Sequence, residues 1–480
     1  MSNKFKPKFH FSCPKGWMND PNGFSFFKGE FHLYYQHNPE DTKWGPMHWG
    51  HATSKDLLHW KEQKIALYPD SSADNEGCFS GTALIENDCQ YLMYTGVSKD
   101  GSENIQQQCL AVNDGEKISK FSDNPVIRTS DVKTEFCKTD FRDPKIWKDD
   151  NTYYCAAVIK KTDNNGAIAL FTSTDLINWQ YKNIIAETKG EMGGMWECPD
   201  VFKLDGKDVI IVSPQSVKAD SEKGFHDGNN SVYMTGTLYM DKAVFTPDVR
   251  PENNFTAAEL DYGIDFYAPQ TTEAPDGRRI MTAWLQAWES YLTPEGNDWS
   301  GMMIMPRELV IKNNCLIQKP VSEYEKMVEN LPFLSGFIYK NMTARFTKEN
   351  YPQCDLTLIA RVPDTKAENP DNEQFTVTVS DDKEGSVDLN FDSNKMELSF
   401  DRSNSINNGG AINRRSVAVT ASKNKLVTFR FIFDTNSCEC FINGGEKVFT
   451  NAYFLNKNVR KITIDSSLTY GLNFKIINIK

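Results

Sequence analysis

A strand–turn–strand unit that recurs along the first two thirds of the chain constrains its fold more than any other feature. In each unit a turn-forming pair follows one apolar strand and leads directly into the next. The unit returns at intervals of roughly 55–70 residues, a length that accommodates four short strands with their loops. The five turns are Lys28-Gly29, Asn87-Asp88, Asp150-Asn151, Asp205-Gly206 and Asp276-Gly277.

A second repeat supports the same periodicity. The stretch from Ser54 to Trp60 returns, with the pattern Ser-x-Asp-Leu-x-x-Trp, from Ser173 to Trp179, about two units further along. Antiparallel units of fixed period that cannot bury both faces alone stack around an axis. We therefore predict an all-β chain in which residues 1–315 form a five-bladed β-propeller. A series of unrelated hairpins in sandwiches is the alternative.

Beyond Cys315 the pattern changes. Gln318-Lys319-Pro320 and the apolar spacing over 321–330 predict a linker with a short helix at residues 316–336. From residue 337 to residue 480, alternating apolar runs separated by Asp, Asn and Gly clusters predict a C-terminal antiparallel β-sandwich. Two domains are also expected from length, because 480 residues exceed the roughly 250–300 at which a single core stops growing.

Charge and composition exclude several classes of partner. With 65 acidic and 53 basic residues the net charge is −12, and no Lys/Arg block stands out, which argues against nucleic acid. We find no apolar run of about 18 residues for a membrane helix, and none follows the N-terminal lysines. The eleven cysteines lie mostly in strand-like runs, which is typical of reduced thiols. We expect a cytoplasmic protein with an uncharged partner, and the oligomeric state stays open.

No metal or cofactor is expected. His48 and His51 are three residues apart, so on a strand they point to opposite faces, and no Glu or Cys ligand accompanies them. The chain also has no nucleophile elbow, no phosphate-binding glycine loop with a lysine and no dinucleotide fingerprint.

A polar motif precedes each of the five turns at a nearly constant distance. The motifs contain Asp20, Ser80, Asp143, Glu197 and Tyr267. If the strand that follows each motif is the innermost strand of its blade, all five motifs lie at the same end of the central channel. Three carboxylates then share one pocket and shift one another's proton affinities, so that one stays ionised while another keeps a proton.

Glycoside cleavage needs this pair of roles, but each motif alone also has a structural explanation. Asp20-Pro21-Asn22-Gly23 has the composition of an ordinary turn, and Arg142-Asp143-Pro144 is compatible with a local charge pair. Glu197, between Trp196 and Cys198, is harder to explain without a partner or a function. The common register of the three acids favours the catalytic interpretation.

Neutral and aromatic side chains suited to sugar binding surround the same strand ends. Asn19, Gln36 and Ser80 offer hydrogen-bonding groups for sugar hydroxyls, although Gln36 is equally able to satisfy a buried backbone group. Aromatic rings stack on sugar faces, but buried Trp and Tyr are also ordinary core residues. Trp44, on a Gly/Pro loop, is the ring that we expect to be exposed.

Six motifs occur in a fixed order along the chain. They are Trp-Met-Asn-Asp-Pro-Asn-Gly at 17–23, Phe-Ser-Gly at 79–81, Arg-Asp-Pro at 142–144, Glu-Cys-Pro at 197–199, Tyr-Ala-Pro-Gln at 267–270 and Pro-Arg-Glu-Leu at 306–309. In sequence and in order they resemble the motifs of the β-fructofuranosidases of glycoside hydrolase family 32. The run at 440–446 is similar to that family's C-terminal sandwich signature, so the resemblance covers the whole chain.

The resemblance implies a retaining glycosidase that releases terminal β-D-fructofuranosyl units, above all from sucrose, through a covalent fructosyl-enzyme intermediate. It implies that Asp20 is the nucleophile, that Glu197 is the acid and base, and that Asp143 holds fructose hydroxyls. No cofactor is implied. The residues at positions that match sugar contacts are Trp17, Met18, Asn19, Gln36, Trp44, Phe79, Ser80, Arg142, Tyr267 and Trp284.

Several alternatives stay open at this level. A sucrose-6-phosphate hydrolase, a fructan exohydrolase and a fructosyltransferase use the same motifs, and a phosphorylated substrate would require cationic groups at the pocket rim. A related five-bladed group that acts on arabinose or xylose polymers lacks the Trp-Met-Asn-Asp-Pro-Asn-Gly form. A non-catalytic carbohydrate-binding protein would be marked by the loss of a carboxylate, and all three are present.

Overall fold

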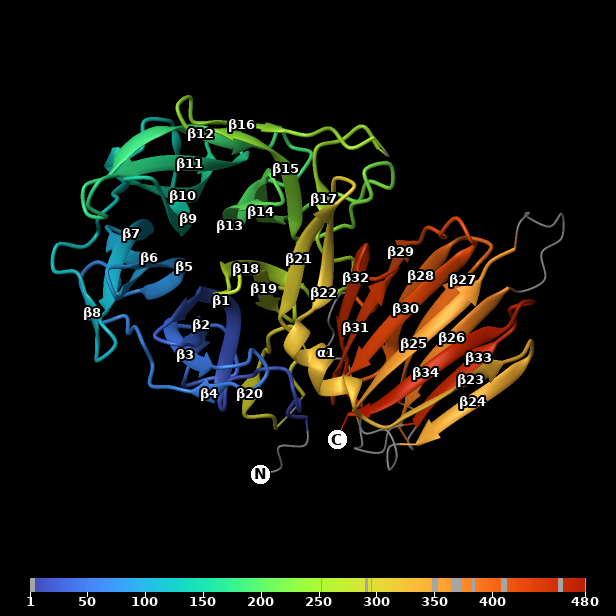
Figure 1. Ribbon diagram of the computed structural model, residues 1–480. Coiled ribbons are helices and arrows are strands. Elements are labelled where there is room, and N and C mark those ends of the chain that lie inside the picture. The colour runs from blue at the N-terminus through green and yellow to red at the C-terminus, as the bar shows by residue number, and fades with distance from the viewer. Residues whose placement is uncertain are drawn as a thin grey trace.

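Two β-sheet domains lie side by side, a ring of sheets and then a two-layer sandwich (Figure 1). The computed structural model describes residues 5–251, 253–289, 292–294, 296–347, 353–363, 373–381, 385–406, 412–455 and 461–479. The predicted all-β propeller followed by a sandwich is confirmed. Among the described residues no helix is long and apolar enough to cross a membrane.

Residues 16–320 form five sheets around a central channel. The innermost strand of each sheet contacts the innermost strand of the next one. The first sheet contains β1 (Gly16–Phe27), β2 (Glu30–Asn38), β3 (His48–Ser54), β4 (Lys61–Glu62) and β20 (Trp299–Ser300). The second contains β5 (Gly77–Glu86), β6 (Cys89–Asp100), β7 (Glu103–Asn113) and β8 (Ile118–Lys120). Strand β20 lies between two strands of the fifth sheet in sequence but pairs in parallel with β1, so it closes the ring.

The other three sheets continue the ring in chain order. The third contains β9 (Phe136–Asp149), β10 (Thr152–Lys161), β11 (Gly166–Ser173) and β12 (Gln180–Glu187), and a short 3₁₀ helix, η1 (Thr129–Asp131), precedes it. The fourth contains β13 (Met195–Leu204), β14 (Lys207–Gln215), β15 (Val232–Tyr239), β16 (Val244–Pro247) and β17 (Ala258–Glu259). The fifth contains β18 (Tyr267–Glu273), β19 (Arg279–Trp284), β21 (Arg307–Lys312) and β22 (Cys315–Pro320).

Each of the five predicted turns joins the innermost strand of a sheet to the second strand. Both central residues have positive φ in three of the turns, with 47° and 85° at Lys28-Gly29, 50° and 58° at Asn87-Asp88, and 48° and 81° at Asp205-Gly206. This type I′ geometry matches the twist of the flanking strands. The turn chemistry therefore sets where each innermost strand ends.

The second repeat also has one local structure in both copies. Asp56 accepts backbone hydrogen bonds from the residues two and three positions further on at 3.1 and 2.8 Å, and Asp175 does so at 3.0 and 2.8 Å. Leu57 and Leu176 have φ of 63° and 65°, and each accepts a hydrogen bond from the tryptophan of its repeat. The motif lies between the third and fourth strands of sheets one and three.

The structure moves the expected domain boundaries. Residues 316–320, which we expected to begin the linker, form β22 on the outer side of the fifth sheet, because an edge strand tolerates polar residues and proline. Helix α1 (Ser322–Glu329) lies within the predicted helical stretch. The sandwich then begins with β23 (Phe333–Ile338), slightly before residue 337.

The sandwich has two six-stranded antiparallel sheets. One contains β23, β34 (Leu472–Ile479), β25 (Gln353–Arg361), β30 (Leu426–Phe433), β31 (Ser437–Ile442) and β32 (Lys447–Ala452). The other contains β24 (Met342–Thr347), β33 (Lys461–Ser466), β26 (Gln374–Ser380), β27 (Ser386–Asp392), β28 (Glu397–Asn404) and β29 (Arg414–Ala418). Buried and half-buried residues alternate along β26, as one face packs on the core. Phe375, Phe391 and Phe429 meet there at ring separations of 4.8–5.5 Å.

A buried ionic network joins the two domains. Arg307 of β21 donates to Asp261 at 2.9 Å and to Glu439 of the sandwich at 3.1 Å. His10 lies between Asp434, at 2.9 Å, and the same Glu439, at 2.7 Å. Burial disfavours ions, but the opposite charges raise the pKa of His10 to about 9 and lower the pKa of both acids to about 2. Each buried ion of the junction therefore has an oppositely charged partner, without which its burial would be costly.

Candidate active site

A pocket of about 500 Å³ opens at one end of the propeller channel. It brings together Asp20 of β1, Asp143 of β9 and Glu197 of β13, which come from three different sheets. The full lining is Asn19, Asp20, Gln36, Trp44, Phe79, Ser80, Gln106, Arg142, Asp143, Glu197, Gln215, Ser216, Asn229, Trp288 and Glu289. Three carboxylates in one small cavity provide the groups that acid–base and nucleophilic chemistry at a glycosidic bond requires.

A local irregularity in the innermost strands aims these side chains. The strand register shifts at the motifs of β1, β5, β13 and β18, and opposite Asp143 in β9. Asp143, Cys198 and Ala268 each precede a proline and have φ of 60°, 47° and 53°. Such backbone is strained for residues other than glycine, and a bulge turns a side chain away from the strand's normal alternation. The strain thus lies where side chains face the pocket.

Asp20 is oriented by two hydrogen-bond donors. Ser80 Oγ donates to Oδ2 at 2.7 Å, and Asn19 Nδ2 donates to Oδ1 at 3.1 Å. Trp17 Nε1 in turn donates to Asn19 Oδ1 at 2.7 Å, which fixes the amide. Burial, and next the charge of Glu197, raise the pKa of Asp20 to about 6, while the bonds from Ser80 and Asn19 oppose this shift. The carboxylate is ionised at neutral pH and readily protonated below it.

Asp143 is the most deeply set of the three acids, with only 5% of the residue exposed. Its Oδ2 accepts a hydrogen bond from the Cys198 backbone N at 2.9 Å, and its own N donates to Thr95 Oγ1 at 2.9 Å. The Cys198 thiol lies 3.6 Å from Asp20 Oδ2 and 3.7 Å from Asp143 Oδ2, so it links the two carboxylates. Burial raises the pKa of Asp143, although the charge of Arg142 opposes the shift.

Both carboxylate oxygens of Glu197 are held in place. Oε1 accepts hydrogen bonds from Arg142 Nε at 3.0 Å and from a terminal Arg142 nitrogen at 2.9 Å. The Tyr267 hydroxyl lies 2.7 Å from Oε2 and also 3.1 Å from the Ser213 carbonyl oxygen. A second ion pair, 2.9 Å from Arg142 to Asp140, fixes the guanidinium. Glu197 therefore faces the pocket between a cation and a phenol.

Six of the residues predicted to bind substrate line the pocket. They are Asn19, Gln36, Trp44, Phe79, Ser80 and Arg142. Trp44 is 49% exposed and meets Phe79 edge to face at 5.8 Å, so its ring is available to a ligand. Gln36 lines the pocket, and its amide nitrogen donates a hydrogen bond to the Cys78 carbonyl oxygen at 3.0 Å.

Four other predicted residues lie behind the pocket wall. Trp17, Met18, Tyr267 and Trp284 are almost completely buried and do not line the cavity. Trp17 packs on Trp284 at 5.7 Å and stacks on Trp288 at 6.1 Å. Trp17 holds Asn19 and Tyr267 holds Glu197. Direct contact of the four residues with a sugar stays a prediction.

The sequence analysis missed part of the lining. These residues are Gln106, Gln215, Ser216, Asn229 and Glu289. None lies in the motif that precedes a turn, so the register that identified the acids gives no signal for them. Trp288, which also lines the pocket, is one of the aromatic residues that the sequence places near the strand ends. Among the described residues no group of three or more His, Cys, Asp or Glu is placed to hold a metal ion.

Comparison with known proteins agrees with this geometry. The model of the glycosyl hydrolases family 32 N-terminal domain matches residues 10–320, and that of the family's C-terminal domain matches residues 329–477. The chain is 33% identical to a sucrose-6-phosphate hydrolase of Escherichia coli, over 97% of this chain and 92% of the relative. It is 30% identical to the raffinose invertase of Escherichia coli, over 98% and 94%.

A solved structure shares the fold over the whole chain. The β-fructofuranosidase of Bombyx mori, solved in complex with sucrose, superimposes with a TM-score of 0.83 at 29% identity, covering 100% of this chain and 95% of that one. A propeller with carboxylates at one end of its channel, followed by a sandwich, is the architecture of a glycosidase. The chain belongs to glycoside hydrolase family 32, as its ordered motifs predicted, and it is a fructofuranosidase of that family.

Proposed function

We propose that this enzyme hydrolyses sucrose in two steps with retention of configuration. Asp20 attacks the anomeric carbon of the fructosyl unit, and the glycosidic bond breaks as Glu197 gives its proton to the leaving oxygen. Glu197 then takes a proton from water, and the resulting hydroxyl displaces Asp20 from the fructosyl carbon. The observation that carries the proposal is the convergence of three carboxylates, each with different partners, in one pocket.

The different partners support different roles. Asp20 receives neutral donors from Ser80 and Asn19, which stabilise an anion without neutralising it, as a nucleophile requires. Glu197 lies against Arg142 and Tyr267, which hold it in place while it gains and loses a proton. Asp143 is fixed by backbone contacts, which suits a group that binds sugar hydroxyls.

The pocket's charge supports unphosphorylated sucrose as the substrate. Arg142 is the one Lys or Arg among the described residues that line it, and this cation is already paired with Asp140 and Glu197. Glu289 adds a further acid to the lining. A phosphate dianion binds where unpaired cations are available. We therefore infer a preference for sucrose over its 6-phosphate, although several relatives, that of Escherichia coli among them, carry the name sucrose-6-phosphate hydrolase.

A comparison of initial rates tests the proposal. We expect kcat/KM for sucrose and raffinose to exceed that for sucrose 6-phosphate by at least about tenfold, which corresponds to about 1.4 kcal/mol. Inulin serves as the polymeric substrate, and released fructose is measured in every case. Faster cleavage of the 6-phosphate would contradict the inferred substrate but leave the catalytic roles standing.

We also propose that the enzyme works in the cytoplasm. All eleven cysteines have free thiols in the structure, which is typical of a reducing compartment. Cell fractionation with sucrase activity as the readout tests this location, and activity found in the medium would contradict it.

A further inference from the structure

Part of the active-site lining comes from a loop of the fourth sheet, residues 216–230, which joins β14 to β15. The loop folds back on itself, and Val217 pairs with Gly228 within it. Ser216 and Asn229, on either side of that pair, both line the pocket. The Ser216 backbone N donates to Asn229 Oδ1 at 2.9 Å. The base of the loop is therefore closed at the wall of the active site.

Glu289, from the segment after β19, extends this group of lining residues. Its Oε1 accepts a hydrogen bond from the Asn229 backbone N at 2.9 Å, and it lines the same pocket. Among the residues that the structure describes, none of Ser216, Asn229 and Glu289 forms a hydrogen bond with the three catalytic carboxylates. Their amide, hydroxyl and carboxylate groups are therefore placed to bind sugar hydroxyls rather than to break the glycosidic bond.

An edge strand of the sandwich contacts this loop. Strand β29 is the terminal strand of its sheet and pairs with β28. The Ser416 carbonyl of β29 accepts a hydrogen bond from His226 Nε2 at 2.7 Å, which satisfies one backbone group of the edge. On its other side the His226 ring lies 2.7 Å, from Nδ1, to Glu259 Oε2, and the His226 backbone N donates to Glu259 Oε1 at 2.6 Å. The loop is thus held between the fourth sheet and the sandwich.

Arg415, the neighbouring residue of β29, adds a second contact. One terminal nitrogen donates to the Gly263 carbonyl at 2.7 Å, and the other donates to the Asp227 carbonyl at 3.3 Å. Burial raises the pKa of Glu289, and the hydrogen bond from Asn229 and the charge of Arg415 oppose this shift. The guanidinium therefore holds the loop backbone two residues before Asn229 and also interacts with the carboxylate that Asn229 contacts.

We propose that Arg415 and His226 are positioning residues through which the sandwich sets the affinity of the active site for its substrate. Both hold the loop that carries Asn229, and the charge of Arg415 attracts Glu289. Neither Arg415 nor His226 lines the pocket, so they act through residues that do. The inference rests on the fructosidase pocket described above and deepens it, because it gives the second domain a part in substrate binding.

Initial rates of fructose release by the full chain test the proposal, with whichever of sucrose, raffinose and sucrose 6-phosphate the parent chain cleaves fastest. We expect Arg415→Met to raise KM at least about fivefold and to leave kcat within about twofold, because binding is lost without a change at the reacting atoms. Arg415→Lys keeps a charge near Glu289 but not the planar fork that reaches two carbonyls. Its KM should lie between those of the parent and Arg415→Met.

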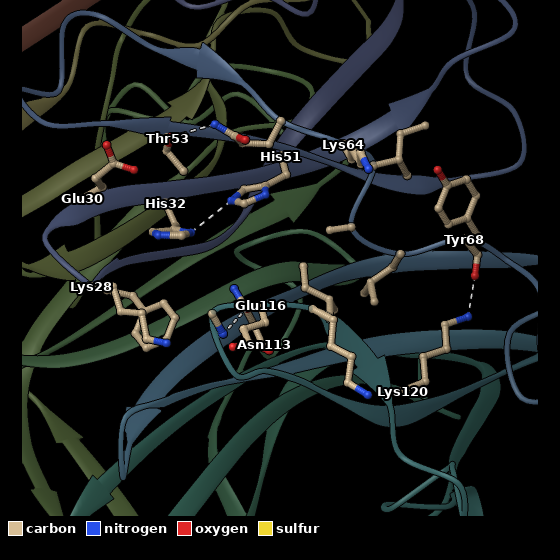
Figure 2. Close-up of a pocket in the computed structure, with 18 of the residues that line it drawn as sticks. Lys28, Glu30, His32, His51, Thr53, Lys64, Tyr68, Asn113, Glu116 and Lys120 are labelled. Atoms are coloured by element: carbon tan, nitrogen blue, oxygen red, sulfur yellow. Dashed lines mark hydrogen bonds between the residues drawn. The ribbon is translucent and has the colours of Figure 1, made fainter.

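Two matched controls each lose one positive charge elsewhere. Arg414→Met removes the adjacent arginine of β29, whose side chain is 75% exposed and pairs with Asp401 at 2.6 Å. Lys64→Met removes an exposed lysine at another pocket, of about 900 Å³, between the first two sheets (Figure 2). That pocket shares no lining residue with the active site. Both controls should keep the KM and the kcat of the parent.

A double background distinguishes positioning from general support of the fold. In a chain that already carries Asn229→Ala and Glu289→Ala, Arg415→Met should change kcat/KM less than about twofold, because the residues through which it acts are gone. A fall there as large as in the parent, or an equal effect of Arg414→Met, would overturn the proposal.

An unchanged KM in Arg415→Met would overturn it as well. Thermal unfolding checks that each variant folds, and if Arg415→Met does not fold, Arg415→Lys decides, since an unchanged KM in that variant has the same meaning. A parent chain that cleaves none of the three sugars would contradict the proposed function. Variants that leave KM unchanged in an active parent would contradict only the positioning role.

Discussion

At the scale of the residue, Asp20 shows a conflict between stability and reactivity. Burial and Glu197 raise the pKa of this carboxyl to about 6, so the folded chain binds its proton more tightly than the unfolded chain does. Above that pH the ionised group therefore destabilises the fold. Strained or destabilised groups of this kind are typical of catalytic sites.

Replacing the carboxylate by its neutral isostere should separate the two effects. We predict that Asp20→Asn lowers kcat for sucrose by about 10⁴-fold or more, because the nucleophile is lost, and raises the thermal midpoint at pH 7. Turnover and unfolding are measured on the same preparation. Near-normal kcat would contradict the role of Asp20 as nucleophile, and a midpoint lower than that of the parent would contradict the destabilising effect of its charge.

The same pKa predicts the acid limb of the activity profile. Asp20 attacks only when ionised, so kcat/KM should rise with pH through about 6, as a property of the coupled Asp20 and Asp143 carboxyls. Glu197→Gln removes a charge that raises both pKa values, so the limb should move to lower pH. The measurement uses a fructosyl donor whose leaving group needs no proton; a limb that stays in place in the variant would contradict the prediction.

At the scale of the element, the sequence predicted where the innermost strands run but not how they bend. Turn-forming pairs such as Lys28-Gly29 have a local cause, so they were visible in the sequence. The positive φ at Cys198 and Ala268 was not, because neither residue favours that backbone. Gln106 and Asn229 lie outside the repeated motifs, so no sequence pattern marked them as part of the pocket.

The paired Asp turns of the first and third sheets offer an internal test. We predict that Asp56→Ala and Asp175→Ala each cost about 0.5–1.5 kcal/mol, because each removes the side chain that accepts hydrogen bonds from two backbone N–H groups of the turn. Chemical denaturation with a fluorescence readout measures both. Lys55→Ala, at an exposed position of the same turn, is the control and should have no effect. Widely different costs for the two aspartates would show that the repeats are not equivalent.

At the scale of the whole molecule, the repeated turns and the change of pattern beyond Cys315 predicted a propeller followed by a sandwich. The junction between them was not predictable, because His10, Arg307 and Glu439 are far apart in sequence and nothing local marks them as partners. The charge of the active-site pocket was not predictable from the sequence either, because it depends on which lysines and arginines are absent from a lining built by several sheets.

The junction predicts how stability depends on pH. The raised pKa of His10, about 9 against an ordinary 6.5, gives a stabilisation that is complete below 6.5 and is lost as pH rises through 9. The lowered pKa values of Asp434 and Glu439, about 2, give a stabilisation that is lost only as pH falls towards 2. We expect His10→Gln to flatten the decline of the thermal midpoint between pH 6.5 and 9. His59→Gln, at an exposed histidine, should leave that slope unchanged; an unchanged slope in His10→Gln would refute the assignment.

The backbone at Gly301, next to the strand that closes the ring, leaves no room for a side chain, so one added methyl group should lower stability and activity. A Cβ on Gly301 would lie 2.0 Å from the Met18 carbonyl oxygen, beside the strand that carries Asp20. Gly301→Ala should therefore lower both the thermal midpoint and kcat. Gly29→Ala has nearly the same φ, 85° against 87°, but open space around its Cβ, so it should cost only about 1 kcal/mol of backbone strain and no activity. Equal effects of the two substitutions would exclude the contact with Met18 as the cause.

The pairing of β20 with β1 also bears on how the enzyme is made. The strand that presents the nucleophile belongs to the first sheet, yet its neighbour on the side away from β2, Trp299–Ser300, is synthesised after the second, third and fourth sheets are complete. A nascent chain on the ribosome therefore holds Asp20 for most of its synthesis without the segment that fixes its strand. Sucrose cleavage can begin only after Trp299–Ser300 has paired with β1. The time at which activity appears during translation would therefore report when that pairing forms.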